Sequence, residues 1–252
     1  MKRLTGQTIL VTGGARRIGR ALCLALANNG ADIVLHHSSS PDEARATSQE
    51  IEALGQRCHV IQANFSDLAT VQALFDQLEG FQPVTGLINN AAIFEDLTWQ
   101  DTDLNAWQRH IDINLSAPFL LSQAFARQLP PTQPGRIVNI LDWRALRPGP
   151  DHLPYTISKT ALAGLTRSLA IAFAPQIAVN GLALGAILPP ADKPEVDYSP
   201  PDNPSLALPL PSVPAGRWAY LDEVTRAVEF LLAGPAYITG EIIHLDGGRH
   251  LI

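Results

Sequence analysis

Short apolar runs alternate with amphipathic segments along the whole chain of 252 residues. The apolar runs predict strands, and the segments with an apolar residue every three or four positions predict helices. We expect strands at residues 8–11, 33–35, 58–62, 86–89, 136–141, 178–184 and 241–245. We expect helices at residues 17–28, 41–54, 68–78, 104–128, 153–172 and 223–232. Strands that alternate with helices predict an α/β fold with a doubly wound, parallel, seven-stranded sheet. Nothing in the chain resembles a linker, so we expect one domain over residues 1–252.

One segment, at about residues 186–215, departs from this alternation. It contains nine prolines between Pro189 and Pro214. Proline removes backbone donors and prevents regular pairing, which predicts a long irregular excursion. Two interpretations are open: a surface loop without fixed structure, or a substrate loop that covers an active site.

The formal net charge of −6 is spread along the chain without a basic cluster, which argues against a nucleic-acid partner. The sequence has neither a signal-peptide core nor an apolar run of membrane-spanning length, so we expect a cytoplasmic protein without a membrane partner. The two cysteines, Cys23 and Cys58, lack metal-ligand spacing. We therefore expect buried thiols and no metal site.

A glycine-rich turn follows the first predicted strand, in the segment Val11-Thr12-Gly13-Gly14-Ala15-Arg16-Arg17-Ile18-Gly19. Glycines allow a backbone to approach a pyrophosphate, and the helix that follows supplies free N–H groups and a favourable dipole. The position of the turn between a first strand and a first helix predicts a dinucleotide site.

This segment resembles the TGxxxGxG fingerprint of the short-chain dehydrogenases/reductases, with Arg17 at the middle glycine. The same replacement occurs in pteridine reductases and their dihydromonapterin-reductase relatives. The resemblance extends over essentially the whole chain and implies a single-domain Rossmann fold. Arg17 would place a cation beside the cofactor phosphates and the mouth of the substrate pocket. The alternative is a solvated arginine at the start of a helix, which the positive helix end disfavours.

The residues after the second predicted strand bear on the choice of cofactor. An acidic residue there would bind the ribose hydroxyls of NAD and repel a 2′-phosphate. The chain instead has His36-His37-Ser38-Ser39-Ser40, and no carboxylate before Asp42. Hydroxyl groups, imidazole and the nearby Arg16 are able to bind a phosphate, so we expect NADP(H).

Further segments match the family's cofactor contacts. Asn64 stands where relatives carry an adenine-binding aspartate, and residues 89–92 resemble the family's NNAG motif, with Ala92 in place of glycine. The residues expected to bind the cofactor are Gly13, Arg16, Arg17, Ile18, His37, Ser38, Ser39, Asn64, Phe65, Asn90, Ala91, Ala92, Tyr155, Lys159, Gly185 and Ile187.

Tyr155 and Lys159 are four residues apart on a predicted helix and therefore project from the same face. A nearby ammonium group favours the phenolate, so we expect Lys159 to lower the pKa of Tyr155 into a useful range. The two residues resemble the family's catalytic pair. Asn114 matches the helix asparagine that supports a water path to the lysine in many relatives.

Asp142, thirteen positions before Tyr155, is the informative departure from the family pattern. Most relatives have a serine there, and an aspartate resembles the pteridine reductases. A carboxyl group is able to pass a proton through the phenol to a ring nitrogen, and burial would raise its pKa and keep it protonated. The alternative is a degenerate site that has lost ketone chemistry.

Phe94 stands where pteridine reductases place an aromatic ring over the bound pterin, although by itself such a residue is more often part of a core. The residues expected to contact the substrate are Arg17, Phe94, Asp142, Trp143, Tyr155 and Leu188.

The resemblance therefore implies an NADPH-dependent pteridine reductase that reduces dihydropterins, and by extension oxidised pterins and dihydrofolate. Its catalytic residues would be Asp142, Tyr155, Lys159 and Asn114, and the family's usual assembly implies a homotetramer. Two alternatives stay open: a carbonyl or 3-oxoacyl thioester reductase, and a non-catalytic NADPH-binding regulator.

Overall fold

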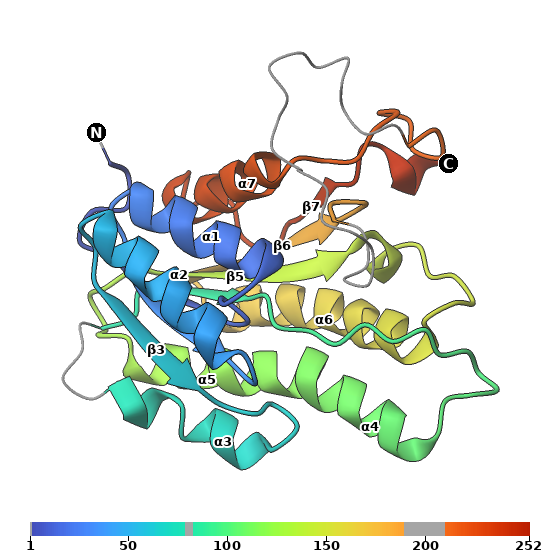
Figure 1. Ribbon diagram of the computed structural model, residues 1–252, viewed down its shortest axis with the longest axis horizontal. Helices are drawn as coiled ribbons and strands as arrows, with labels where there is room; N and C mark the ends of the chain where they lie inside the picture. The colour runs from blue at the N-terminus through green and yellow to red at the C-terminus, as the bar shows by residue number, and fades with distance from the viewer. Residues whose placement is uncertain (1, 79–82, 189–209) are drawn as a thin grey trace.

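Seven parallel strands form one sheet in the computed structural model, which describes residues 2–78, 83–188 and 210–252 (Figure 1). The strand order is β3-β2-β1-β4-β5-β6-β7, and every neighbouring pair is parallel. The strands are β1 (Thr8–Val11), β2 (Asp32–His37), β3 (Cys58–Gln62), β4 (Gly86–Asn89), β5 (Gly135–Asp142), β6 (Ile177–Leu184) and β7 (Ile242–Leu245). The predicted single-domain Rossmann-like α/β fold is confirmed.

Helices cover both faces of this sheet (Figure 1). One face carries α1 (Arg17–Asn28), α2 (Pro41–Ala53) and α7 (Leu221–Ala233). The other face carries α3 (Leu68–Gln72), α4 (Leu104–Ile111), α5 (Ala117–Gln128) and α6 (Leu153–Ala172). Alternate residues of β1 serve the two layers, because Ile9 and Val11 pack on the first face and Leu10 on the second. The sheet is therefore buried on both sides, which explains the continuous apolar strands in the sequence.

Two predicted helices are divided in the structure. The helix predicted at residues 104–128 consists of α4, a π-helical segment Asp112–Ser116 and α5. Pro118 has no N–H to donate to the carbonyl four residues earlier, at Asn114, which favours the wider π turn there. The helix predicted at residues 68–78 consists of α3 and a 3₁₀ turn, Phe75–Leu78.

The predicted substrate loop at residues 186–215 falls mostly on residues 189–209, which lie outside the described residues. Among the residues that are described, no helix is long and apolar enough to cross a membrane.

The strand order reverses beside β1, because β2 and β4 lie on its two sides. Open parallel sheets bind their ligands at such a reversal, outside the carboxyl ends of the strands. The glycine-rich turn after β1, the polar segment after β2 and Asn90 after β4 all lie at this edge.

A buried polar chain fixes α6 against the strands. Asn89 at the end of β4 donates to Oδ1 of Asn139 in β5 at 2.8 Å, and Nδ2 of Asn139 donates to Oγ1 of Thr166 in α6 at 2.9 Å. All three residues are buried. The chain sets the position of α6, and so of the residues on its first turns, relative to β5.

Replacement of Asn139 by leucine should lower the free energy of unfolding by about 2 kcal/mol, because Asn89 and Thr166 each lose a buried hydrogen bond to Asn139. Urea denaturation measures the change. Asn105→Leu, on an exposed position of α4, is the matched control and should change the stability by less than about 0.5 kcal/mol. Equal effects of the two substitutions would contradict the role assigned to the chain.

Candidate active site

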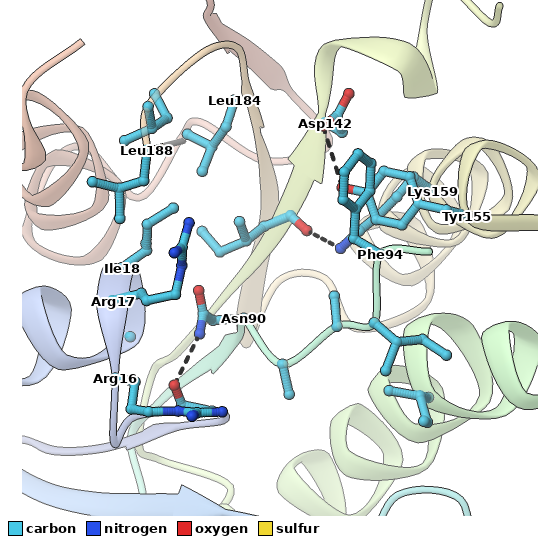
Figure 2. Close-up of a pocket in the computed structure, with 18 of the residues that line it drawn as sticks. Arg16, Arg17, Ile18, Asn90, Phe94, Asp142, Tyr155, Lys159, Leu184 and Leu188 are labelled. Carbon is cyan, nitrogen blue, oxygen red and sulfur yellow. Dashed lines mark hydrogen bonds between the residues drawn. The ribbon is translucent and has the colours of Figure 1, made fainter. Parts of the chain in front are cut away.

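A cavity of about 690 Å³ extends from the β1–α1 turn to the start of α6. Figure 2 shows Arg16, Arg17 and Ile18 on one side of it and Asp142, Tyr155, Lys159 and Phe94 on the other. Every residue expected to contact cofactor or substrate lines this cavity, and of the expected catalytic residues only Asn114 does not. The structure thus brings together predicted residues that lie up to 175 positions apart in the sequence, from Gly13 to Leu188.

The turn after β1 is closely packed at its glycine positions. Gly13 has a φ of +65°, and a Cβ on it would lie 3.2 Å from Cα of Ala91. A Cβ on Gly19 would overlap the carbonyl oxygen of Gly13. Asn90 holds the turn, because its Nδ2 donates to the carbonyl of Thr12 at 2.8 Å. No side chain caps the start of α1, so its first N–H groups are available to an anion.

Arg17 has a left-handed backbone conformation with a φ of +52°, at the position where the fingerprint has glycine. Such a conformation costs a non-glycine residue about 1–2 kcal/mol. Its side chain reaches into the cavity beside Ile18 and Asn90 (Figure 2). A strained non-glycine residue in the wall of a cavity indicates a functional role for its side chain.

His36 has a structural role that the sequence did not reveal. Its Nδ1 accepts from the N–H of Gly13 at 3.1 Å, its Nε2 donates to the carbonyl of Ala63 at 3.0 Å, and its ring stacks on Phe65 at 4.1 Å. Burial lowers the pKa of His36 to about 4. The ring is therefore neutral with both nitrogens occupied, and it has no N–H left to donate to a phosphate.

The polar side chains available to a cofactor phosphate at this end are those of Arg16, Ser38 and Ser39. Burial also lowers the pKa of His37, so it brings no charge at neutral pH. Arg16 is 62% exposed and lies 3.8 Å from the carboxylate of Glu43, which leaves its guanidinium accessible. Ser38 and Ser39 line the cavity beside it, whereas Oδ1 of Asn64 accepts from the N–H of Ser66 within its own turn.

Asp142 and Tyr155 are in direct contact at the opposite end. The phenol of Tyr155, on α6, donates to Oδ2 of Asp142, the last residue of β5, at 3.2 Å. Nζ of Lys159 donates to the carbonyl of Ile140 at 2.7 Å and lies 5.8 Å from the centre of the tyrosine ring. Burial lowers the pKa of Lys159 to about 8, which Asp142 partly opposes.

The pKa of Tyr155 differs from the sequence-based expectation. Burial raises it well above the usual value, and the adjacent Asp142 raises it further, while Arg144 opposes both. The prediction that Lys159 lowers the pKa of Tyr155 is wrong for this structure, because its ammonium group is bound to Ile140 and the nearer charge is a carboxylate. Tyr155 is therefore a protonated phenol, which suits a proton donor.

The pKa of Asp142 is raised by burial, and this is opposed by Arg144, Lys159 and Tyr155. The N–H of Arg144 donates to Oδ1 of Asp142 at 2.8 Å, and its Nη1 lies 3.8 Å from the same oxygen. The Arg144 guanidinium is shared with Asp151, whose Oδ2 accepts from Nη2 at 2.7 Å. Arg144 and Asp151 were not predicted from the sequence, because their pairing beside Asp142 depends on the path of the loop between β5 and α6.

Asn114 lies in the π-helical segment and is fully buried. Its Oδ1 accepts from the N–H of Ile93 at 2.9 Å, and its Nδ2 donates to the carbonyl of Ile93 at 3.1 Å and to Oγ of Ser158 at 3.0 Å. Asn114 thus fixes the segment that carries Phe94 against α6. The proposed water path to Lys159 stays a prediction.

Phe94 is 51% exposed and packs edge-on against Tyr155, with ring centres 4.7 Å apart. Its face stacks on His152 at 4.0 Å. It therefore stands at the mouth of the site, above the proposed proton donor. The part of the chain that the structure describes contains no cluster of side chains able to bind a metal ion.

Comparisons with known proteins agree with this geometry. The family profile described as short chain dehydrogenase matches residues 7–198. A 3-oxoacyl-[acyl-carrier-protein] reductase from a Synechocystis strain is 32% identical over 251 residues, covering 98% of both chains.

Solved structures are also similar. FolM alternative dihydrofolate reductase 1 from Brucella canis, complexed with NADP, is 35% identical with a TM-score of 0.87 and covers 99% of this chain and 96% of that one. A short-chain dehydrogenase from Burkholderia cenocepacia, in complex with NADP, is 34% identical with a TM-score of 0.86. The match covers 98% of this chain and 99% of that one.

The contacts of Arg144 lead to a testable expectation. Asp151→Asn removes the charge that competes for Arg144, so the guanidinium should stabilise the Asp142 carboxylate more strongly and lower the pKa of Asp142. NMR titration of ¹³Cγ-labelled aspartate, assigned with an Asp142→Asn variant, measures this value. Asp96→Asn, whose carboxylate is 84% exposed and faces His152, is the matched control and should leave it unchanged. An Asp142 pKa that stays the same or rises in the Asp151 variant would refute the coupling.

Proposed function

The chain belongs to the short-chain dehydrogenase/reductase family, and we propose that it is an NADPH-dependent reductase of pterin rings that acts on dihydropterins and dihydrofolate. The observation that carries this proposal is the hydrogen bond between the Tyr155 phenol and the largely buried Asp142 carboxyl group. The similarity to a FolM alternative dihydrofolate reductase supports it.

The cavity residues fit NADP(H). The closely packed turn at Gly13 and Gly19 leaves room for a pyrophosphate at the start of α1, with Arg17 beside it. Arg16, Ser38 and Ser39 offer a cation and hydroxyl groups to a 2′-phosphate, and no carboxylate lines that end of the cavity. Similar structures contain NADP.

Bound NADPH supplies a hydride for the ring carbon. The residues of this chain supply the proton: Tyr155 donates it to the adjacent ring nitrogen, and Asp142, whose pKa burial raises, returns a proton to the phenol. Lys159, held by the carbonyl of Ile140, places a positive charge behind the pair. One face of Phe94 packs on His152, and the half-exposed ring would offer its other face at the mouth of the site for stacking on a flat heterocycle.

A second candidate is a 3-oxoacyl thioester reductase, and the 32% identity to such an enzyme over nearly the whole chain favours it. The pair Tyr155 and Lys159 is compatible with that reaction. Reduction of a 3-oxoacyl thioester does not account for the Asp142 carboxyl group beside the Tyr155 phenol.

The deciding test is replacement of Asp142 by serine. The rate of dihydropterin reduction in single-turnover experiments should fall by roughly 10²- to 10⁴-fold, the usual contribution of a general acid–base group. Asp142→Asn should lose a similar amount, since the amide keeps the shape without an exchangeable carboxyl proton. NADPH affinity, measured by fluorescence, should stay near that of the parent. A serine variant that gains activity on 3-oxoacyl thioesters and loses none on dihydropterins would overturn the proposal.

Arg17→Gly separates binding from folding. Glycine adopts a φ of +52° without cost, so the free energy of unfolding should stay the same or rise by up to about 1 kcal/mol. The dissociation constant of NADP⁺ and the KM for dihydropterin should both rise.

Arg20→Gly, on the exposed face of α1, is the matched control. It should lower stability by about 1 kcal/mol through helix propensity and leave both binding constants unchanged. Unchanged binding in the Arg17 variant would show that its guanidinium contacts neither ligand.

A further inference from the structure

The cavity is strongly cationic in a chain whose net charge is −6. Asp142 is the one carboxylate among the described residues that line it, and the cationic residues there are Arg16, Arg17, Arg144, Lys159 and Arg249. Arg16 and Arg17 lie at the end assigned to the cofactor phosphates. The other three lie at the end assigned to the substrate, so their charges bear on what the substrate is.

Two of these three charges have partners within the chain. Arg144 is bound by Asp151 at 2.7 Å and lies 3.8 Å from Asp142. Lys159 is buried behind Tyr155 and donates to the carbonyl of Ile140. Arg249 differs, because within residues 2–78, 83–188 and 210–252 no carboxylate lies within 4.0 Å of its guanidinium. It is a cation on the cavity wall without an acidic partner in the described chain.

Arg249 is held firmly in this position. The carboxylate of the buried Asp246 accepts from the N–H of Gly248 at 3.0 Å and from the N–H of His250 at 2.8 Å, which closes a tight turn around it. The guanidinium carbon lies 4.3 Å from the centre of the Trp143 ring, and Nη1 of Arg147 donates to the Arg249 carbonyl at 3.2 Å. Stacking on an aromatic face orients a guanidinium and reduces the entropy lost when it binds a ligand.

The order of residues along the cavity wall indicates where a substituent on the substrate ring would point. Tyr155 meets Asp142, Trp143 follows Asp142 in sequence, and Arg249 lies over Trp143. A ring whose reacting nitrogen is at Tyr155 would therefore direct a substituent past Trp143 toward Arg249. The exposed Arg147 adds a second positive charge beside this exit.

We propose that Arg249 binds an anionic group on the side chain of the substrate, so that the preferred pterin carries a carboxylate or a phosphate. This inference rests on the proposed function and makes its substrate class more specific. A guanidinium binds either anion through two parallel hydrogen bonds. The carboxylates of a glutamate tail and a phosphate ester are therefore the two candidate sources of charge.

The experiment compares Arg249→Gln with the parent enzyme on three substrates. Dihydroneopterin has a neutral side chain, dihydroneopterin monophosphate carries a phosphate, and dihydrofolate carries carboxylates. For the preferred anion, the ratio of its kcat/KM to that of dihydroneopterin should fall about tenfold in the variant, equivalent to ~1.4 kcal/mol. The loss should lie in KM, and in the parent enzyme the same ratio should fall as salt is raised. Arg226→Gln, an exposed arginine of α7 paired with Asp222, is the matched control and should leave the ratio unchanged.

A fall confined to the phosphate ester, or to dihydrofolate, identifies the source of the anion, and both results support the proposal. A ratio that is unchanged for both anions, or equal losses on all three substrates, overturns it while the proposed function stands. If the parent enzyme reduces none of the three, the proposed function fails instead. The site is then tested by calorimetry with p-aminobenzoylglutamate and with inorganic phosphate on the NADP⁺-loaded protein. At least one should bind about tenfold more weakly to Arg249→Gln, and equal affinity for both would overturn the proposal.

Discussion

The hydrogen bond that Tyr155 donates to Asp142 joins the carboxyl end of β5 to the first turns of α6, and both sides of it are held by the core. β5 is paired along its whole length with β6, so Asp142 has little freedom. α6 is fixed by the bond of Thr166 to Asn139 and by that of Lys159 to Ile140, both on β5. The phenol donates to the carboxyl group at 3.2 Å, which lowers the pKa of Asp142, whereas the carboxyl group raises the pKa of Tyr155. The contact therefore keeps the proton on the phenol, and the chemistry available at this end follows from that unequal effect.

The cofactor end of the cavity lies at the same edge of the sheet, but it is positioned by close packing of the backbone around glycine. Here backbone atoms approach one another so closely that Gly19 admits no side chain, and Gly13 has a positive φ that disfavours one. Asn90, after β4, and His36, on β2, hold the turn by hydrogen bonds. His36 is rigid because both ring nitrogens are occupied and its face is covered by Phe65. The two ends are therefore positioned independently, one by packing around glycine and the other by side-chain hydrogen bonds.

The sequence predicted those features that depend on local pattern. Strands and helices follow from periodicity, and the glycine-rich turn, Tyr155, Lys159 and Asp142 were found from their spacing and their resemblance to a family. The sequence could not predict that Arg144 and Asp151 would share one ion pair beside Asp142, because that pairing depends on the path of the loop between β5 and α6. For the same reason the direction of the pKa shift of Tyr155 was wrong: it depends on which charge is nearest in space. Arg249 was missed because it lies more than ninety residues from Tyr155 and reaches the cavity only through the turn at Asp246.

The left-handed backbone at Arg17 has a consequence for how such enzymes diverge. Glycine and arginine codons can differ by a single base, and residue 17 already has the left-handed backbone conformation that glycine adopts without steric cost. A lineage can therefore exchange one residue for the other in one mutational step without reorganising the fold. The folding energy at this position even favours the loss of the arginine. If Arg17 contacts the ligands as proposed, position 17 is a place where such a fold could acquire or lose a substrate preference by a single substitution.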